Sequence, residues 1–73
     1  MTNTEALNKK IHECGYKKGW LAEQLGLSGY GFALKINNRN QFTAIEIQRL
    51  CKLLHIVSLE EKDRIFFADD VDV

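Results

Sequence analysis

Three Ser/Thr-x-x-Glu patterns recur along this chain and constrain its fold more than any other feature. They begin at Thr2, Thr43 and Ser58, and each precedes apolar residues spaced three or four apart. In such a capping box the hydroxyl accepts the third amide of a new helix while the glutamate reaches back to the first. Three of these patterns in 73 residues, without a single proline, predict an all-α chain.

The first half of the chain reads as two amphipathic helices separated by glycine. The first is expected to run from Thr2 to Gly15, a residue that suits the left-handed conformation at helix ends. The second is expected over about residues 18–25, after which Gly26 supplies the positive φ for a sharp turn. The residues expected to face the core are Leu7, Ile11, Cys14, Leu21, Ala22 and Leu25.

After a short break, Ser28 can cap a third helix whose two faces differ in character. Phe32 and Ile36 lie four residues apart and are expected to pack on the second helix. The face expected to point outward is made of Gly29, Tyr30, Ala33 and Leu34. This outward face bears most directly on function, because it offers few polar side chains.

A polar loop at residues 37–40, rich in asparagine that tolerates left-handed backbone, leads to two further helices. The fourth is expected to follow Thr43 and the fifth to follow Ser58. Their expected core residues are Ile47, Leu50, Cys51, Leu54, Ile65 and either Phe66 or Phe67. We expect a compact five-helix bundle in one domain, with residues 69–73 fraying as an acidic tail.

The net charge of zero conceals an uneven distribution. Residues 1–59 hold eight Lys or Arg and four Glu, whereas residues 60–73 hold two basic and six acidic residues. A modest basic excess is compatible with a phosphate surface, and the acidic end would be kept away from DNA. Charge alone therefore leaves the choice between nucleic acid and protein open.

Residues that carry chemistry are few and scattered. Cys14 and Cys51 lack a C-x-x-C spacing, and His12 and His55 do not cluster with them, so neither zinc nor a disulfide is indicated. We expect both cysteines to fill core space. Paired carboxylates, a nucleophile with a base and a phosphate loop are all missing from the sequence, which predicts a protein that is not an enzyme.

The same reasoning predicts no cofactor, no metal and no small-molecule substrate. The longest apolar run falls far short of the roughly 20 residues that a bilayer crossing needs. The N-terminus also lacks a basic stretch that leads into an apolar one. We therefore expect a cytoplasmic protein without a membrane contact.

Residues 15–28, GYKKGWLAEQLGLS, resemble the helix-turn-helix signature of the phage Cro and repressor-like family. The residues that carry the likeness are Leu21, Ala22, Leu25, Gly26, Leu27 and Ser28. Residues 35–47, KINNRNQFTAIEI, extend the likeness, which covers residues 4 to about 68. The resemblance implies the repressor-like helix-turn-helix type of five-helix fold.

In that family the third helix reads bases in the major groove, while the second helix and the loop after the third grip phosphates. The resemblance assigns the reading positions to Gly29, Tyr30, Gly31 and Leu34. It assigns phosphate contacts to Lys18, Asn37 and Arg39, with Lys18 standing where the family usually has Gln. These positions offer little base-specific recognition, because none of them supplies a bidentate pair of hydrogen bonds. Each such pair contributes about 1–3 kcal/mol of discrimination against the wrong base.

Two interpretations of the third helix stay open. The glycines can let the helix approach DNA closely, with Tyr30 donating to a base or phosphate and Leu34 touching a thymine methyl. Alternatively, a small apolar face meets another protein. That face comprises Gly29, Tyr30, Gly31, Ala33 and Leu34.

The second interpretation fits phage antirepressors of the modulator-of-repression type, which this chain resembles and which bind a phage repressor. Masking the DNA-binding domain of the repressor would free its operators by competition. We expect this function together with supplementary contact to the DNA backbone. The alternative is a stand-alone Cro-like repressor that binds operator DNA, and a third possibility is a homodimer that buries the same face.

Two further residues are secondary candidates for the interface. An exposed Ile45 near the start of the fourth helix would widen an apolar surface. Trp20, beside Leu21, either contacts the partner or belongs to the core or its lid.

Overall fold

The computed structural model describes residues 1–68, which form five α-helices. These are α1 (Thr4–Cys14), α2 (Lys18–Gln24), α3 (Gly29–Ile36), α4 (Ala44–Leu53) and α5 (Leu59–Phe66). The predicted all-α class with five helices is confirmed. The predicted acidic tail at residues 69–73 lies outside the described part of the chain.

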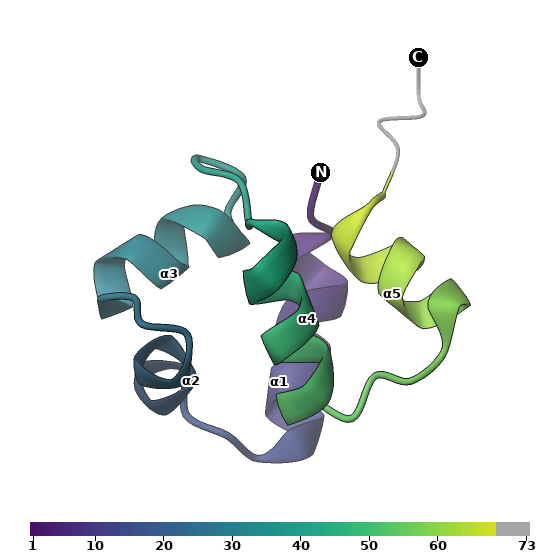
Figure 1. Cartoon of the computed structure of the whole chain (residues 1–73), viewed down its shortest axis with the longest axis horizontal. Helices are drawn as coiled ribbons and strands as arrows, with labels where there is room; N and C mark the ends of the chain where they lie inside the picture. Colours follow the sequence, from purple (N-terminus) through teal and green to yellow (C-terminus); the bar gives the residue numbers. More distant parts are fainter. Residues whose placement is uncertain (69–73) are drawn as a thin grey trace.

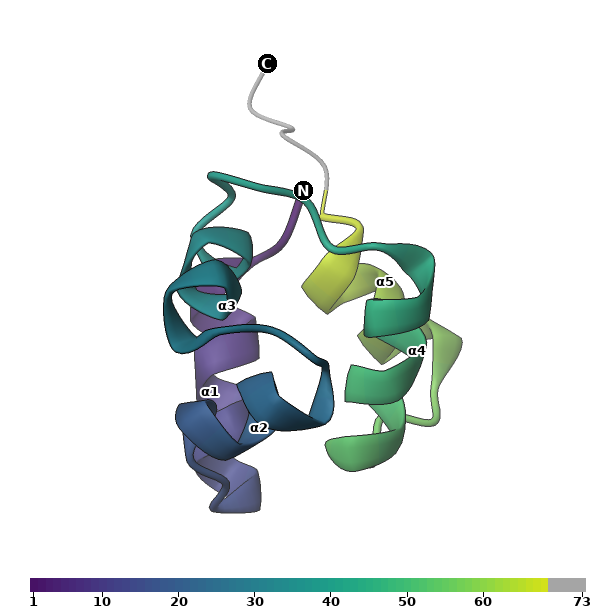
Figure 2. The ribbon, with the colours of Figure 1, turned by 60° about the vertical axis from the view of Figure 1, so that its left-hand side comes forward.

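The helices enclose the core from several sides. α2 packs on α3, and α1 packs on α5. In Figure 1, α3 lies at one end of the long axis and α5 at the other, with α4 in front of α1 between them. Figure 2, turned by 60°, again places α3 and α5 on opposite sides of the molecule. The outward face of α3 is therefore well separated from α5.

One hydrophobic cluster fills the space between the helices. Its largest fully buried side chains are Phe32, Leu7, Leu21, Leu50, Leu54 and Ile65. The half-buried ring of Phe42 extends the cluster, because its centroid lies 6.1 Å from that of Phe32 and 5.8 Å from that of Phe66. Phe66 is 4% exposed and Phe67 is 53% exposed, so Phe66 is the phenylalanine that closes the core.

The capping box predicted at Thr43 is confirmed. The Thr43 hydroxyl accepts the Glu46 N–H at 3.2 Å, and the Glu46 carboxylate accepts the Thr43 N–H at 2.9 Å. Phe42 and Ile47 flank this cap at the positions of a hydrophobic staple, and both pack in the core region. The start of α4 is thus fixed by polar and apolar contacts together.

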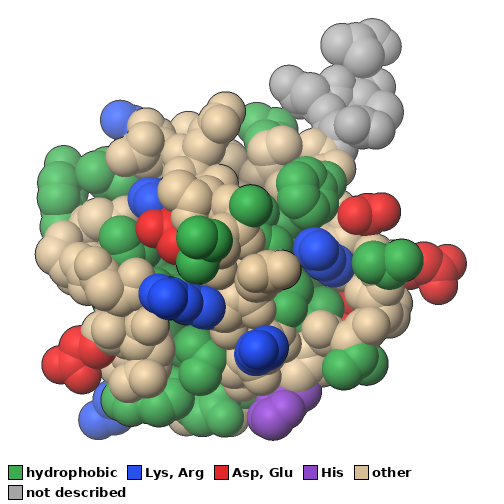
Figure 3. Space-filling model, in the orientation of Figure 1, with side chains coloured by type: hydrophobic (Ala, Val, Ile, Leu, Met, Phe, Trp, Pro, Cys, Tyr) green, Lys and Arg blue, Asp and Glu red, His purple; other side chains and the backbone are tan. Residues whose placement is uncertain are grey.

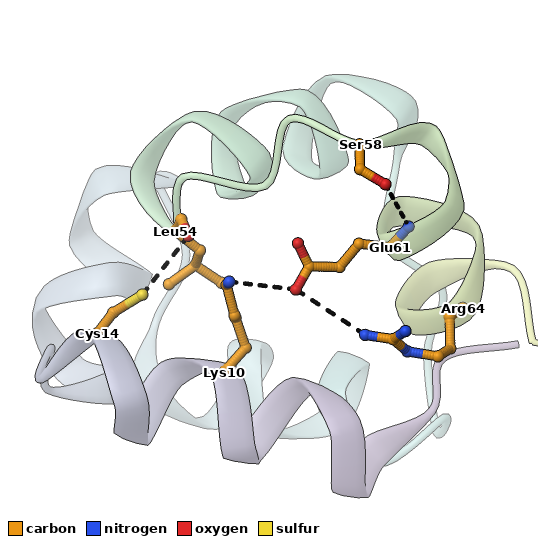
Figure 4. A network of polar contacts seen from close by, with 6 residues as sticks. All are labelled: Lys10, Cys14, Leu54, Ser58, Glu61 and Arg64. Carbon is orange, nitrogen blue, oxygen red and sulfur yellow. Dashed lines mark hydrogen bonds and ion pairs between the residues drawn. The ribbon is translucent and has the colours of Figure 1, made fainter.

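The box predicted at Ser58 forms only in part. The Ser58 hydroxyl accepts the Glu61 N–H at 3.0 Å, so Ser58 caps α5 as expected. The Glu61 carboxylate turns instead toward α1, where it lies 3.1 Å from Lys10 Nζ, and it lies 3.9 Å from Arg64 (Figure 4). A tertiary ion pair has replaced the local contact.

The box predicted at Thr2 is wrong, because Asn3 caps α1. The Asn3 side-chain oxygen accepts the Ala6 N–H at 3.0 Å. Thr2 is buried and held by Asn38, whose side-chain amide accepts the Thr2 N–H and donates to the Thr2 carbonyl, both at 2.8 Å. Because this contact spans 36 residues, no local pattern could show it.

The remaining turns follow the sequence expectations. Gly15 and Gly26 have φ values of 76° and 72°, and Asn38 in the polar loop has a φ of 62°. Further backbone hydrogen bonds join the N-terminal residues to the end of α5, with Asn3 donating to Ile65 at 2.7 Å. Within residues 1–68, none of the helices combines the length and apolar character needed to cross a bilayer.

Candidate interaction surface on α3

The N-terminal part of α3 presents an exposed tip, which we define as Gly29, Tyr30, Gly31, Ala33 and Leu34. Tyr30 is 76% exposed, and Gly29 and Ala33 are also exposed. Gly31 and Leu34 are half-buried, so Leu34 is only partly exposed on the face that was expected to point outward. The structure therefore brings the predicted interface residues together on one short helix, with Leu34 at the margin.

The two glycines of the tip differ in what the fold requires of them. At Gly31 an added Cβ would come within 3.1 Å of the Ser28 hydroxyl, which accepts the Gly31 N–H at 2.9 Å and caps α3. At Gly29 an added Cβ would meet no atom of residues 1–68 within 4 Å, apart from its chain neighbours and the adjoining backbone of its own helix. Gly31 thus protects the cap, whereas the packing of residues 1–68 gives no reason for a glycine at position 29.

Hydrogen-bonding side chains are scarce on the tip. Tyr30 is the one tip residue with a polar side-chain group, and its neighbours contribute backbone, methyl and isobutyl groups. The hydroxyl of Ser28, just before the tip, is engaged in the cap. A surface of this kind has little to offer a base edge and is suited to close apolar contact.

The inner side of α3 holds the tip rigidly in place. Phe32 and Ile36 are buried, as predicted. Lys35 Nζ lies 2.6 Å from the Glu46 carboxylate at the start of α4, with both side chains 12% exposed. The Ile36 carbonyl also accepts the hydroxyl of Thr4 at 2.7 Å. A partner would therefore meet a preformed surface.

The Lys35–Glu46 pair sets the charge state of Glu46. Burial alone would raise the pKa of this carboxyl, but the hydrogen bonds from Lys35 and from Thr43 together with the charge of Lys35 lower it below 4.5. Glu46 is therefore ionised at neutral pH and serves the cap and the ion pair at once.

The predicted phosphate contacts fall on three separate positions. Lys18 is exposed in the first turn of α2, and Arg39 is exposed in the loop after α3. Asn37 is also exposed, but its side-chain amide donates to the Ala33 carbonyl at 2.9 Å and so caps the end of α3. Of these three, the Lys18 and Arg39 side chains form no ion pair or hydrogen bond within residues 1–68.

The secondary candidates occupy different parts of the surface. Trp20 is 41% exposed and stacks on Tyr16, with ring centroids 5.0 Å apart, so it acts as a lid at the edge of the core. Ile45 is 60% exposed, as expected, but it lines a groove between α4 and α5. The same groove is lined by Val57 and Leu59, two exposed residues that the sequence reasoning missed.

A readable signal for Val57 was present in the sequence. Val57 precedes the Ser58 cap, where an apolar residue usually packs against an apolar one at the fourth helical position. In α5 that fourth position is Lys62. Val57 therefore lacks a staple partner, which explains why it is 93% exposed while Phe42, before the α4 cap, is half-buried.

The two cysteines lie at the edge of the core. Cys14 and Cys51 are free thiols, half-buried at the edge of the core, and Cys14 donates to the Leu54 carbonyl at 3.5 Å (Figure 4). Burial raises the pKa of the Cys51 thiol, which keeps it protonated at neutral pH. Among residues 1–68, no three His, Cys, Asp or Glu side chains come together as a metal site.

Comparison with known proteins adds no information on these surfaces. No family model, curated protein or solved structure gives a match to the chain.

Proposed function

We propose that this chain is a regulator of a phage genetic switch that binds a partner repressor through the α3 tip and keeps that repressor off its operators. In this view the chain is a binding protein and not an enzyme. The observation that carries the proposal is the tip itself: an open position at Gly29 beside the exposed Tyr30 and Ala33.

The physical reason for proposing a protein contact is that Gly29 allows a partner backbone to approach α3 closely. Glycine in a helix costs up to about 1 kcal/mol relative to alanine, and no neighbour among residues 1–68 requires it at position 29. A partner backbone that rests on this position would gain contact that a methyl group would block. Tyr30 beside it offers a large amphipathic anchor of the kind that dominates protein interfaces.

Charge further defines the contact. The exposed cations at the start of α2 and in the loop after α3 are Lys17, Lys18 and Arg39. The DNA-binding surface of a repressor is itself basic, so the two surfaces would repel each other weakly. The contact must then be apolar in its centre, and raising the salt concentration should leave it unchanged or strengthen it slightly by screening.

The alternative function is a stand-alone Cro-like repressor that binds operator DNA, and the exposed Lys18 and Arg39 favour it. The two functions differ in their response to salt. DNA binding should weaken with a log–log slope of about −0.9 for each phosphate contacted. Titration of the chain against duplex DNA and against repressor over a range of salt concentrations therefore separates them.

A substitution on the tip tests the protein contact directly. Ala33→Asp places a charge on an exposed helix position, where it should not disturb the core, and should strand that charge in the apolar contact. We expect complex formation with the repressor encoded beside this chain to fall by at least about tenfold in calorimetry. Lys9→Asp on the exposed side of α1 is the matched control and should bind normally.

A complex that forms equally well with Ala33→Asp would place the contact elsewhere. Ala33→Asp is preferred to a change at Leu34, because Leu34 is half-buried and a charge there could weaken folding as well as binding.

A further inference from the structure

The groove between α4 and α5 combines an apolar centre with charges of a single sign. It has a volume of about 610 Å³ and is lined by α4, the segment that follows α4 and the first part of α5. Ile56 is 6% exposed and Cys51 is half-buried, so these two side chains form its floor. The exposed Ile45, Val57 and Leu59 form its apolar rim. Three exposed apolar side chains around one groove make a patch of the kind that marks an interface.

Among residues 1–68, every charged residue that lines the groove is basic. Arg49 and Lys52 belong to α4 and Lys62 belongs to α5, and these three form no ion pair within the described residues. The neighbouring Glu61 turns away to pair with Lys10 of α1 at 3.1 Å (Figure 4). Figure 3 looks onto this face and shows basic side chains between hydrophobic ones over α4 and α5. Positive charge therefore lies on both sides of the apolar centre.

This composition discriminates between possible occupants. A second copy of the chain in a two-fold contact would bring the same cations against one another, which is unfavourable. Nucleic acid would neutralise the cations, but its hydrated phosphates would leave Val57 and Leu59 without an apolar partner. A protein segment that carries both apolar and acidic side chains satisfies the cations and the apolar centre together.

The position of the cations also favours one shape for that segment. Its acidic groups must border an apolar stripe on two sides, because the cations come from both α4 and α5. In a β-strand alternate side chains point to opposite faces, so the residues between the apolar ones would point away from the groove. In an amphipathic helix the apolar stripe is bordered by other side chains on each edge.

We propose that the α4–α5 groove binds an acidic amphipathic helix of a partner protein. The apolar stripe of that helix lies in the groove, with Glu or Asp on one border against Arg49 and Lys52 and on the other border against Lys62. The α3 tip shares no residue with the groove, so this contact does not depend on the function proposed above.

A displayed library of helical peptides tests the chemistry of the occupant. Each peptide carries apolar residues at positions i, i+3, i+4 and i+7, and the positions that border this stripe vary among Glu, Gln and Lys. Selection on the full chain should enrich Glu over Lys on both borders by at least about tenfold. Selection of no peptide, or of Lys as often as Glu, would overturn the proposal.

Fluorescence anisotropy of the most enriched peptide then locates the contact. Val57→Asp changes a side chain that is 93% exposed, so folding should be unaffected, and peptide binding should weaken by at least about tenfold. Arg49→Glu with Lys52→Glu should weaken it to a similar extent. Lys17→Glu with Lys18→Glu makes the same change of net charge at exposed positions outside the groove and should bind normally. Circular dichroism confirms folding, and wild-type affinity in a folded Val57→Asp variant would contradict the proposal.

Other results would assign the groove to a different occupant. Binding of duplex DNA in place of the peptide, lost in the α4 charge variant, would indicate nucleic acid. A wild-type dimer in sedimentation equilibrium that Val57→Asp makes monomeric, without peptide binding, would indicate a second copy. Peptide binding that requires replacement of the aspartates among residues 69–73 by Asn would indicate the acidic end of this chain. Ala33→Asp on the α3 tip should bind the peptide normally, so the failure of either proposal can be recognised separately.

Discussion

The placement of α3 against α4 depends in part on the single side chain of Glu46. It completes the cap of α4 and also pairs with Lys35 of α3 across 2.6 Å. Its pKa is lowered in the folded protein, so its contribution to stability is fully present above its ordinary pKa of 4.5. That contribution is lost as the pH falls through the lowered folded pKa.

Replacing Glu46 with Gln should therefore destabilise the protein at neutral pH. Gln can still accept the Thr43 N–H, but Lys35 is left partly buried without its counter-charge. We expect a loss of about 1–3 kcal/mol in urea unfolding. The difference from wild type should shrink as the pH is lowered below 4.5. Glu23→Gln, on an exposed position of α2, should change neither quantity.

Asn38 is a second residue whose effect can be isolated. Its side chain holds both backbone groups of Thr2, and its own backbone has a φ of 62°. Asn38→Gly loses the two hydrogen bonds but tolerates the backbone angle, and should cost about 1–3 kcal/mol. Asn38→Ala also places a Cβ in the left-handed region and should cost about 1 kcal/mol more. Equal losses for the two variants would show that the backbone angle is unimportant.

At the scale of the helix, replacing glycine with alanine should change stability in opposite directions at the start of α3 and in the turn before it. Gly29→Ala adds a methyl group in open space, so stability should be unchanged or rise by up to about 1 kcal/mol. Gly26→Ala forces a residue with a Cβ to adopt a φ of 72°, so stability should fall by about 1 kcal/mol. Thermal unfolding measures both, and a stability loss for Gly29→Ala would show that this glycine serves the fold and not a partner.

Local patterns predicted most of the helices, because capping and glycine turns act over a few residues. The start of α3 at Ser28, the turn at Gly26 and the α4 box all follow from their own sequence. The errors arise where a distant residue competes for the same group. Thr2 is held by Asn38, and Glu61 is drawn to Lys10, which no spacing rule can show.

One candidate surface could be predicted from local sequence patterns, and the other could not. Exposure of Gly29, Tyr30 and Ala33 follows from helical periodicity once Phe32 is assigned to the core. The α4–α5 groove was missed because Val57 and Leu59 flank a cap and belong to no amphipathic repeat. Its existence depends on how α5 is set against α1 and α4, which is a property of the packed molecule.

At the scale of the whole molecule, α3 lies at one end of the long axis, with α4 between it and α5 (Figure 1). The residues of the α3 tip are separate from those that line the α4–α5 groove. Contact with a repressor through the α3 tip therefore does not require the groove.

The α3 tip is tested most directly by the anisotropy of fluorescent operator DNA that is saturated with repressor. Added protein should lower the anisotropy to that of free DNA in proportion to the repressor present, and Ala33→Asp should leave it high. The chain alone should leave the anisotropy of the free operator almost unchanged. Tight, sequence-selective binding of operator by the chain alone, with no effect on the repressor, would contradict the proposed role of α3.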